Sequence, residues 1–130
     1  MLNIKKYYNK MREVACGIMR NKKGLILMGL RHSGYWEFPG GKLEEGEGIK
    51  YCLKREWIEE LNLKIEIHKE IYSCKYNYYF CRFFTGIILN EEDININVHK
   101  KVEFLDIDQI RKLKLFESDY HILDLLQNMN

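Results

Sequence analysis

The stretch that most constrains the fold is residues 41–63, where glycine, charged and apolar residues recur at fixed spacings. If residues 49–61 form one helix, Glu56, Glu59 and Glu60 stand at positions i, i+3 and i+4 and share one face. Like charges at this spacing oppose the helix by roughly 0.2–0.5 kcal/mol per pair. A divalent cation among the oxygens explains the cluster, because Mg²⁺ binds a few carboxylates together with substrate phosphates. The alternative is a plain solvated acidic face.

The residues around this helix also favour a site. The preceding segment, residues 38–42, includes Gly40 and Gly41, and glycine lets the backbone turn sharply and approach a ligand closely. Gly48 is an acceptable N-cap, and Asn62 tolerates the left-handed conformation that ends many helices. The predicted core-facing stripe, spaced four residues apart, is Ile49, Leu53 and Trp57.

Residues 41–63 resemble the Nudix box, G-x5-E-x7-R-E-U-x-E-E-x-G-U, in which U is a bulky aliphatic residue. The matching positions, which include every charged position of the box, are Gly41, Glu47, Arg55, Glu56, Glu59, Glu60 and Leu63. Two positions depart, since Trp57 occupies an aliphatic site and Asn62 replaces the last glycine. The resemblance implies an α/β fold, a Nudix-type α/β/α sandwich with a central mixed sheet, in one domain over residues 1–130.

The resemblance also implies roles for the charged residues of the box. It implies that Mg²⁺, or Mn²⁺ in its place, binds the carboxylates of Glu56, Glu59 and Glu60 and the carbonyl of Gly40. It gives a structural role to the pair Glu47 and Arg55, which would hold the loop against the helix. The alternative for that pair is a surface ion pair worth under about 1 kcal/mol.

Hydrolysis of a phosphoanhydride requires charge neutralisation on the phosphate and an activated water. Among the predicted catalytic residues, Glu56, Glu59 and Glu103, we favour Glu56 as the general base. Glu103 is the second candidate, because it precedes Phe104 where MutT-like members of the family can carry a fourth acidic ligand. The alternative for Glu103 is the solvent face of a strand.

Four residues outside the box are candidates for substrate binding. Arg31 ends a predicted strand at a position from which MutT-like enzymes contact phosphates, and a guanidinium suits phosphate geometry. Asp119 lies in residues 115–119, which resemble a MutT-like stretch that reads the base edge, although an acid in a first helical turn also complements the helix dipole. Phe38 and Phe80 are candidates to stack on the base.

Hydrophobic periodicity predicts the remaining elements. Strands are expected over residues 12–19, 25–30, 63–67 and 102–105, and two more strands within 71–84, with a turn near 75–77. Residues 32–48 are expected to be a long loop, and 90–101 are either an edge strand or a mobile loop. A short helix capped by Asp106 or Asp108 and a last helix capped by Ser118 follow. The stripe predicted for the last helix is Ile122, Leu125, Leu126 and Met129.

Composition narrows the class of protein. No apolar run approaches the roughly 18 to 20 residues of a membrane span, and residues 1–11 lack the apolar core of a secretory signal, so we expect a cytoplasmic protein without membrane contact. The four cysteines show no C-x-x-C spacing, which argues against a zinc ribbon or redox pair. Cys16 and Cys52 lie in apolar segments and are expected to be buried thiols.

The leading functional hypothesis is a Mg²⁺-dependent MutT-like pyrophosphohydrolase that converts a nucleoside triphosphate to monophosphate and pyrophosphate, with 8-oxo-dGTP the first substrate to test. Alternatives are a Nudix hydrolase of CTP, a modified pyrimidine nucleotide, a nucleotide sugar or a dinucleoside polyphosphate, and a non-catalytic nucleotide-binding module. The expected partner is a small nucleotide, with no stable nucleic-acid complex, for a monomer or homodimer. The basic N-terminal segment, residues 1–31, and the tyrosines at 72, 76, 78 and 79 leave single-stranded nucleic acid as a further alternative.

Overall fold

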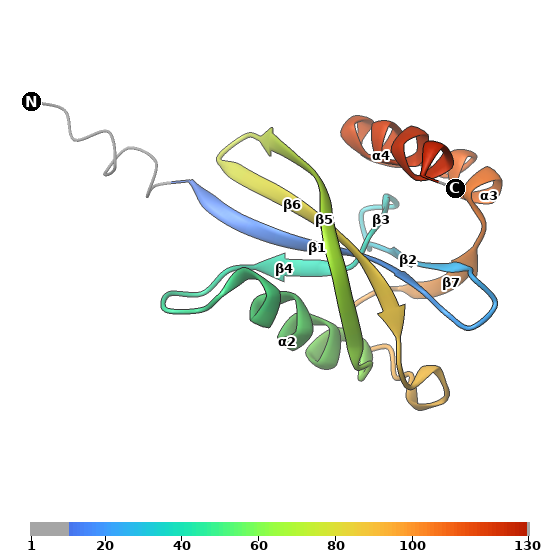
Figure 1. Cartoon of the computed structure of the whole chain (residues 1–130), viewed down its shortest axis with the longest axis horizontal. Coiled ribbons are helices and arrows are strands. Elements are labelled where there is room, and N and C mark those ends of the chain that lie inside the picture. Colours follow the sequence, from blue (N-terminus) through green and yellow to red (C-terminus); the bar gives the residue numbers. More distant parts are fainter. Residues whose placement is uncertain (1–10, 130) are drawn as a thin grey trace, which may run out of the picture.

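The structure is a computed structural model that describes residues 11–129 (Figure 1). The elements in chain order are β1 (Arg12–Arg20), β2 (Ile26–Leu30), β3 (Trp36–Glu37), β4 (Gly40–Lys42), α2 (Ile49–Leu61), β5 (Ile65–Tyr76), β6 (Tyr79–Ile88), a 3-10 turn (Glu91–Asp93), β7 (Lys101–Leu105), α3 (Ile107–Arg111) and α4 (Glu117–Asn128). Within these residues, every helix is too short or too polar to cross a membrane. The first ten residues of the basic N-terminal segment lie outside the described residues.

The sheet is mixed, as predicted. β1 runs parallel to β6, whereas every other pairing is antiparallel, in the order β3-β2-β1-β6-β5, with β4 on β1 and β7 on β2. β1 and β2 pair only at Arg20 and Ile26, while the earlier part of β1 pairs with β4. β1 and β2 therefore diverge away from the turn that joins them, and this divergence leaves space for a site.

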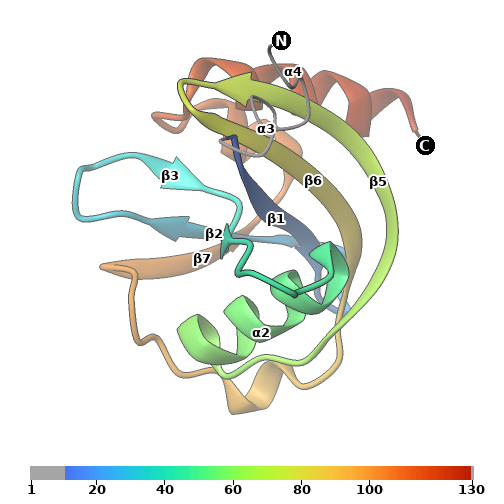
Figure 2. The same cartoon turned by 90° about the vertical axis from the view of Figure 1, so that its left-hand side faces the viewer.

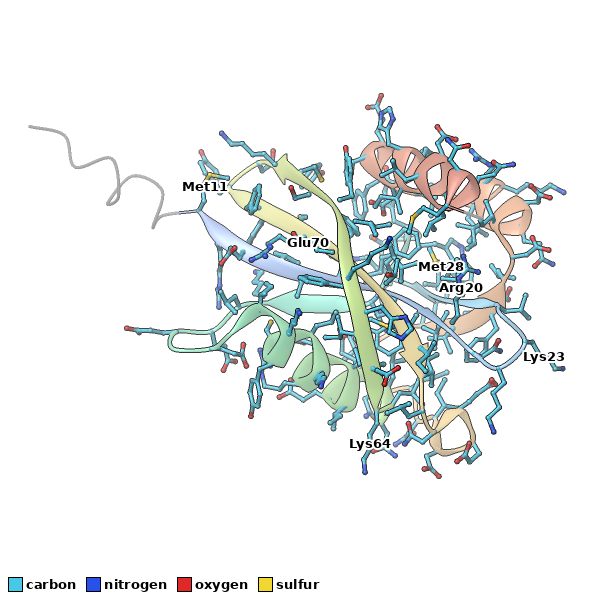
Figure 3. All side chains as sticks on the ribbon, in the orientation of Figure 1. Met11, Arg20, Lys23, Met28, Lys64 and Glu70 are labelled. Atoms are coloured by element: carbon cyan, nitrogen blue, oxygen red, sulfur yellow. The ribbon has the colours of Figure 1, made fainter. Side chains whose placement is uncertain are left out.

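Helices cover both faces of the sheet (Figure 2), which confirms the α/β/α arrangement. Strand residues alternate between the faces, so Ala15 and Met19 pack against Leu53 of α2, whereas Ile18 and Met28 belong to the cluster that includes Ile122 of α4. Figure 3 shows Met28 among the side chains beneath α4, and Lys23 pointing away from the protein at the β1–β2 turn. Each face thus has its own hydrophobic core.

α2 begins and ends where the sequence predicts. Gly48 is the extended N-cap, and Asn62 adopts a left-handed conformation (φ 57°) with its backbone N–H bonded to the carbonyl of Ile58. Leu53 and Trp57 of the predicted inner stripe are fully buried, and Ile49 packs at the edge of the same cluster.

Trp57, which departs from the box, fills a space that Gly17 leaves open. Its Nε1 donates a hydrogen bond to the Pro39 carbonyl at 2.9 Å. A Cβ added at Gly17 would lie 2.6 Å from the same nitrogen. The indole therefore joins α2 to both β1 and the loop before β4.

The expected loop at residues 32–48 contains two short strands, which corrects the prediction. Trp36 and Glu37 pair with β2, and residues 40–42 pair with β1. Such short strands exist because a distant strand offers backbone partners, so local periodicity does not reveal them. A Cβ at Gly40 would lie 1.8 Å from the carbonyl oxygen of Ala15, so the close pairing of β4 with β1 requires glycine there.

Three further predictions need correction. β5 runs unbroken, with two bulges, through the strand expected at 63–67 and the next one, whereas the turn at Asn77 (φ 53°) before β6 is close to the predicted one. α4 is capped by Phe116, without a side-chain cap, because the helix begins at Glu117 and not after Ser118. Of the predicted stripe of this helix, Leu125 and Met129 are exposed, and Leu123 is buried together with Ile122 and Leu126. α3, in contrast, has the predicted Asp106 cap, in a capping box with Gln109.

Residues 90–101 are neither an edge strand nor a free loop, because they cap the C-terminal end of α2. The backbone N–H groups of Asn95 and Asn97 donate to the carbonyls of Leu61 and Glu60, and the Asn97 side chain donates to the carbonyl of Glu59. The last carbonyls of a helix have no partner within it, so they need such donors. This segment holds the part of α2 that carries Glu59 and Glu60.

Candidate active site

A cavity of about 830 Å³ opens beside the divergence of β1 and β2. Its walls come from β1, the segment between β2 and β4, the β5–β6 hairpin, the start of α4 and residues 98–99. The cavity reaches Glu60 of α2 at one end and Asp119 of α4 at the other. Of the predicted site residues, those that line it are Arg31, Phe38, Gly40, Glu60 and Asp119.

Arg55 is the centre of an ion-pair network beside the cavity. Its Nε lies 2.5 Å from Glu47 Oε2, and its Nη2 donates to Glu47 Oε1 at 2.9 Å. Its Nη1 donates to Glu56 at 3.0 Å and to Glu59 at 3.1 Å. The side chains of Arg55 and Glu47 are only 17% and 7% exposed. Hydrogen bonding to Arg55 lowers the pKa of Glu47 to about 2, so this carboxylate remains charged.

The three glutamates of the box have different surroundings. Glu59 is 58% exposed, whereas Glu56 is largely buried and its pKa is raised by burial, against the opposing effect of Arg55. Glu60 is buried, and among the described residues its Oε2 has no hydrogen-bond partner. Burial, and then the charges of Glu37, Glu56 and Glu59, raise the pKa of Glu60 to about 8. A buried carboxylate without a partner is the group that gains most from a nearby cation.

The donor set fits a hard metal ion, although the side chains do not yet converge on one. In residues 11–129 no three His, Cys, Asp or Glu side chains stand together as a ready metal site, since Arg55 bonds to both Glu56 and Glu59. The unpartnered oxygen of Glu60 and these carboxylates are nevertheless the ligand type that hard cations prefer. Gly41 allows the loop to approach them, because a Cβ there would lie 2.3 Å from the Glu56 carboxyl carbon.

The end of the cavity beside α4 is enclosed and weakly polar. Asp119 is only 5% exposed, and its hydrogen-bond partner among residues 11–129 is the Ser118 hydroxyl at 3.5 Å. Burial, and then the charge of Glu37, raise the pKa of Asp119 to about 7. The other walls at this end include the thiols of Cys16, Cys74 and Cys81. Cys16 is thus only half-buried in the cavity wall, whereas Cys52 is fully buried as predicted.

Aromatic and cationic side chains surround the mouth of the cavity. Arg31 is half exposed, and its guanidinium lies 5.5 Å from the centre of the Phe116 ring, which stacks on Tyr35 at 4.7 Å. Tyr76, on the β5–β6 hairpin, contacts the same Phe116 ring at a centroid distance of 5.8 Å. Of the four tyrosines considered for base stacking, Tyr76 and Tyr79 line the cavity, Tyr72 packs at the edge of a core cluster and Tyr78 is exposed elsewhere.

Two candidate residues lie away from the cavity. Glu103 alternates with Val102 and Phe104, which pack toward α2, so it lies on the other face of β7, where it pairs with Lys101 at 3.3 Å. Phe80 likewise alternates with Tyr79 and Cys81, which do line the cavity. Phe38 lines the cavity but is buried, with its ring edge-on to Phe83 at 6.2 Å.

Sequence reasoning missed Glu37 and His99, which meet in the wall of the cavity. His99 Nε2 lies 2.7 Å from Glu37 Oε2. The only signal for Glu37 is its place next to Phe38, just before the glycine-rich segment. A single histidine in a polar stretch gives no signal, so His99 could be found only from the fold.

Comparison with known proteins agrees with this geometry. Residues 10–126 match the NUDIX domain family. A relative from Buchnera aphidicola (subspecies Schizaphis graminum), described as an 8-oxo-dGTP diphosphatase, is 29% identical over 128 residues, which cover 92% of this chain and 96% of the relative.

Two solved structures are similar in fold. The E. coli ORF135 protein superposes with a TM-score of 0.76 at 23% identity, covering 92% of this chain and 91% of its own. A C. elegans Ap4A hydrolase gives a TM-score of 0.76 at 16% identity, covering 91% and 96%. With the family matched over most of the chain, this protein belongs to the Nudix hydrolases, is MutT-like, and is a pyrophosphohydrolase that acts on phosphoanhydrides.

Proposed function

We propose that the protein hydrolyses a nucleoside triphosphate to the monophosphate and pyrophosphate, with 8-oxo-dGTP as the first substrate to test. The observation that supports this proposal is one cavity with a carboxylate at each end: Glu60 of the box, whose Oε2 has no hydrogen-bond partner within residues 11–129, and the buried Asp119. A nucleotide has the same two-ended chemistry, with phosphates at one end and a hydrogen-bonding base at the other. The relative from Buchnera aphidicola, which carries the 8-oxo-dGTP diphosphatase description, favours the same class.

Nudix enzymes typically use a divalent metal ion, and we propose Mg²⁺, with Mn²⁺ as a substitute. The residues that would hold it are Glu56, Glu59, Glu60 and the carbonyl of Gly40. When bound, the ion supplies charge neutralisation on the phosphate oxygens and activates water. Arg55 and Glu47 would position Glu56 and Glu59, because one guanidinium bonds to all three carboxylates.

Glu56 is the proposed general base, which accepts the proton of the attacking water. It suits this role because it is partly buried and its pKa is raised, so it holds a proton more readily than an exposed glutamate. Glu59 would assist as a second acidic group of the same cluster. Arg31, at the mouth, would bind the phosphates of the substrate through its guanidinium.

Asp119 is the proposed reader of the base. As a carboxylate it accepts hydrogen bonds from N1–H and N2–H of guanine, or from the amino group of cytosine. The thiols and Phe83 around it supply a weakly polar wall. Phe38 would border the base instead of stacking on it, because its ring already packs against Phe83.

A second candidate substrate is a dinucleoside polyphosphate. The feature that favours it is the group of rings at the mouth, where Tyr76 remains half exposed beside the stacked pair of Tyr35 and Phe116. A second base could stack there, since aromatic side chains offer a flat face to any base.

The test is a pyrophosphate-release screen with Mg²⁺ over the canonical nucleoside triphosphates, 8-oxo-dGTP, 5-hydroxy-dCTP and Ap4A. We expect one triphosphate to exceed the others, and Glu59→Gln to lower its turnover by about 100-fold, the scale of losing one charge-stabilising group. The matched control is Glu66→Gln, an exposed glutamate of β5 outside the cavity. Hydrolysis of Ap4A alone would favour the second candidate, and equal activity in Glu59→Gln would contradict the proposed site.

A further inference from the structure

Glu37 and His99 form a buried pair that the proposed catalysis does not use. His99 Nε2 lies 2.7 Å from Glu37 Oε2, and the His99 side chain is only 1% exposed. Because a carboxylate accepts, Nε2 carries the proton, which leaves Nδ1 as the other polar atom of the ring. Within residues 11–129 that Nδ1 is buried and has no hydrogen-bond partner. His99 is thus a desolvated imidazole whose side-chain hydrogen bond, among the described residues, is to one oxygen of Glu37.

The backbone is shaped around this pair. Glu37 lies on β3 and His99 just before β7, and both strands pair with β2 at Gly29 (Figure 1). To reach Glu37 the ring crosses Gly29 of β2, where an added Cβ would lie 2.4 Å from the ring. Any larger residue at position 29 would displace the imidazole. The pair is therefore a built feature of the cavity wall, where both residues face the same space.

The second oxygen of Glu37 remains available to a ligand. Its nearest charged neighbour among the described residues is Arg31, whose Nε lies 3.8 Å away, beyond ordinary hydrogen-bond distance. The Glu37 side chain is 25% exposed, so it faces the cavity and not the core. One oxygen is thus held by the protein, while the other can accept a hydrogen bond.

The position of Glu37 identifies which part of a nucleotide it meets. It lies on β3 and lines the same cavity as Glu60 at one end and Asp119 at the other. In the proposed function these ends take the phosphates and the base, and the sugar is the group that joins them. The negative charge of a carboxylate repels a phosphate, whereas a sugar hydroxyl is neutral and donates a strong hydrogen bond to a carboxylate.

We infer that Glu37, positioned by His99, binds the 3′-hydroxyl of the nucleotide sugar and makes the enzyme selective for substrates that carry it. This inference rests on the proposed function. Glu37 is the binding residue, and His99 acts through it as a positioning residue. The ligand class is a nucleotide with a free 3′-hydroxyl, not a 3′-deoxy analogue or a nucleotide linked through that oxygen.

The test compares GTP, dGTP and 2′,3′-dideoxy-GTP as substrates, together with binding of the three matching monophosphates by calorimetry. For the native protein we expect kcat/KM for dGTP to exceed that for the dideoxy analogue by about tenfold or more, the effect of one hydrogen bond to a charged group. In Glu37→Ala and in the isosteric Glu37→Gln we expect this preference to fall below about threefold, because the charged acceptor is lost. Because both substrates are measured with the same protein sample, the ratio of their kcat/KM values does not depend on the fraction of protein that is folded.

His99→Gln should lower the ratio of kcat/KM for dGTP to that for the dideoxy analogue, but less than the Glu37 variants do, mainly by raising KM for dGTP. The Mg²⁺ concentration needed for half-maximal rate should stay unchanged. The matched control is Glu66→Gln, which removes an exposed glutamate–histidine pair (Glu66 Oε2 to His68 Nε2, 3.0 Å) outside the cavity and should leave the ratio within twofold of native.

The inference would be overturned if the ratio of kcat/KM for dGTP to that for the dideoxy analogue were the same in the native protein and the Glu37 variants. It would also be overturned if the variants lost equal kcat/KM for both substrates and needed a different Mg²⁺ concentration. The monophosphate titration separates this failure from that of the proposed function. If no triphosphate is hydrolysed but dGMP binds about tenfold more tightly than its dideoxy analogue, and Glu37→Ala abolishes that difference, the sugar contact stands without the activity.

Discussion

Glu47, beside one end of the site, and Asp119, at the other, are stabilised in opposite ways. Near α2, Glu47, Glu56 and Glu59 share the guanidinium of Arg55, and the pKa of Glu47 falls to about 2. Beside α4, Asp119 lies among thiols, and its pKa rises to about 7. Glu47 therefore keeps its charge at any pH in which a cell works, whereas the charge of Asp119, like that of Glu60, depends on what binds beside it.

This contrast gives stability a pH dependence of opposite sign at Glu47 and at Asp119. The pKa of Glu47 is lowered on folding, so its contribution is present above about pH 4.5 and is lost as pH falls toward 2. The pKa of Asp119 is raised on folding, so its contribution is full below about pH 3.8 and is lost as pH rises through 7.

The strongest test of the contrast is Glu56→Gln, which removes the proposed base from the α2 end. We expect kcat to fall by about 100-fold or more with a smaller change in KM, because proton abstraction is lost while the shape of the side chain is kept. Steady-state kinetics on the best triphosphate of the screen would measure this, with circular dichroism to check folding. Near-native turnover would remove Glu56 from the role of base.

Arg55→Lys tests whether the α2 end depends on the geometry of the guanidinium and not only on its charge. A lysine keeps the charge but cannot bond to Glu47, Glu56 and Glu59 at once. We expect kcat/KM to fall by about tenfold and Tm to be lower, because several charge-assisted hydrogen bonds are weakened at once. If Tm and kcat/KM were both native-like, the network would be a surface feature without a positioning role.

Asp119→Asn tests the other end through stability. The amide cannot ionise, so the loss of stability expected between about pH 4 and 7 should disappear, an effect of about 1.4 kcal/mol for each pKa unit removed. Urea unfolding of both proteins at pH 4, 5.5, 7 and 8 would measure it, with the variant gaining on the native protein as pH rises. Parallel stability profiles would show that Asp119 is not desolvated as the structure indicates.

The smallest expected effect is that of Glu103→Gln. Because Glu103 lies on the far face of β7 and pairs with Lys101, we expect kcat/KM within about twofold of native, as for an exposed ion pair. Turnover of the same triphosphate provides the measurement. A loss of tenfold or more would bring Glu103 back as the acid that the resemblance suggested.

Much of the α2 end could be predicted from the sequence, because its determinants are local. The limits of α2, the buried Leu53 and Trp57, and the left-handed Asn62 all follow from spacing within one helix. The mixed sheet and the two helical layers also follow from the order of elements together with the family resemblance.

The rest depends on partners that are distant in sequence. β3 and β4 are strands only because β2 and β1 lie beside them. In the segment 90–101, Ile94, Ile96 and Val98 alternate as in a strand, yet its asparagines bond to the carbonyls that end α2. His99 and Glu37 are 62 positions apart and meet only in the folded chain. A pattern of single residues cannot show such meetings.

The contact between Trp57 and Gly17 has a consequence for how such a chain can change by mutation. The indole occupies the place where a side chain at position 17 would begin. Even the methyl group of alanine at position 17 would require a smaller residue at position 57 or a displacement of α2. While the tryptophan remains, substitution of Gly17 conflicts with the indole, so the two positions can change only together or with Trp57 first.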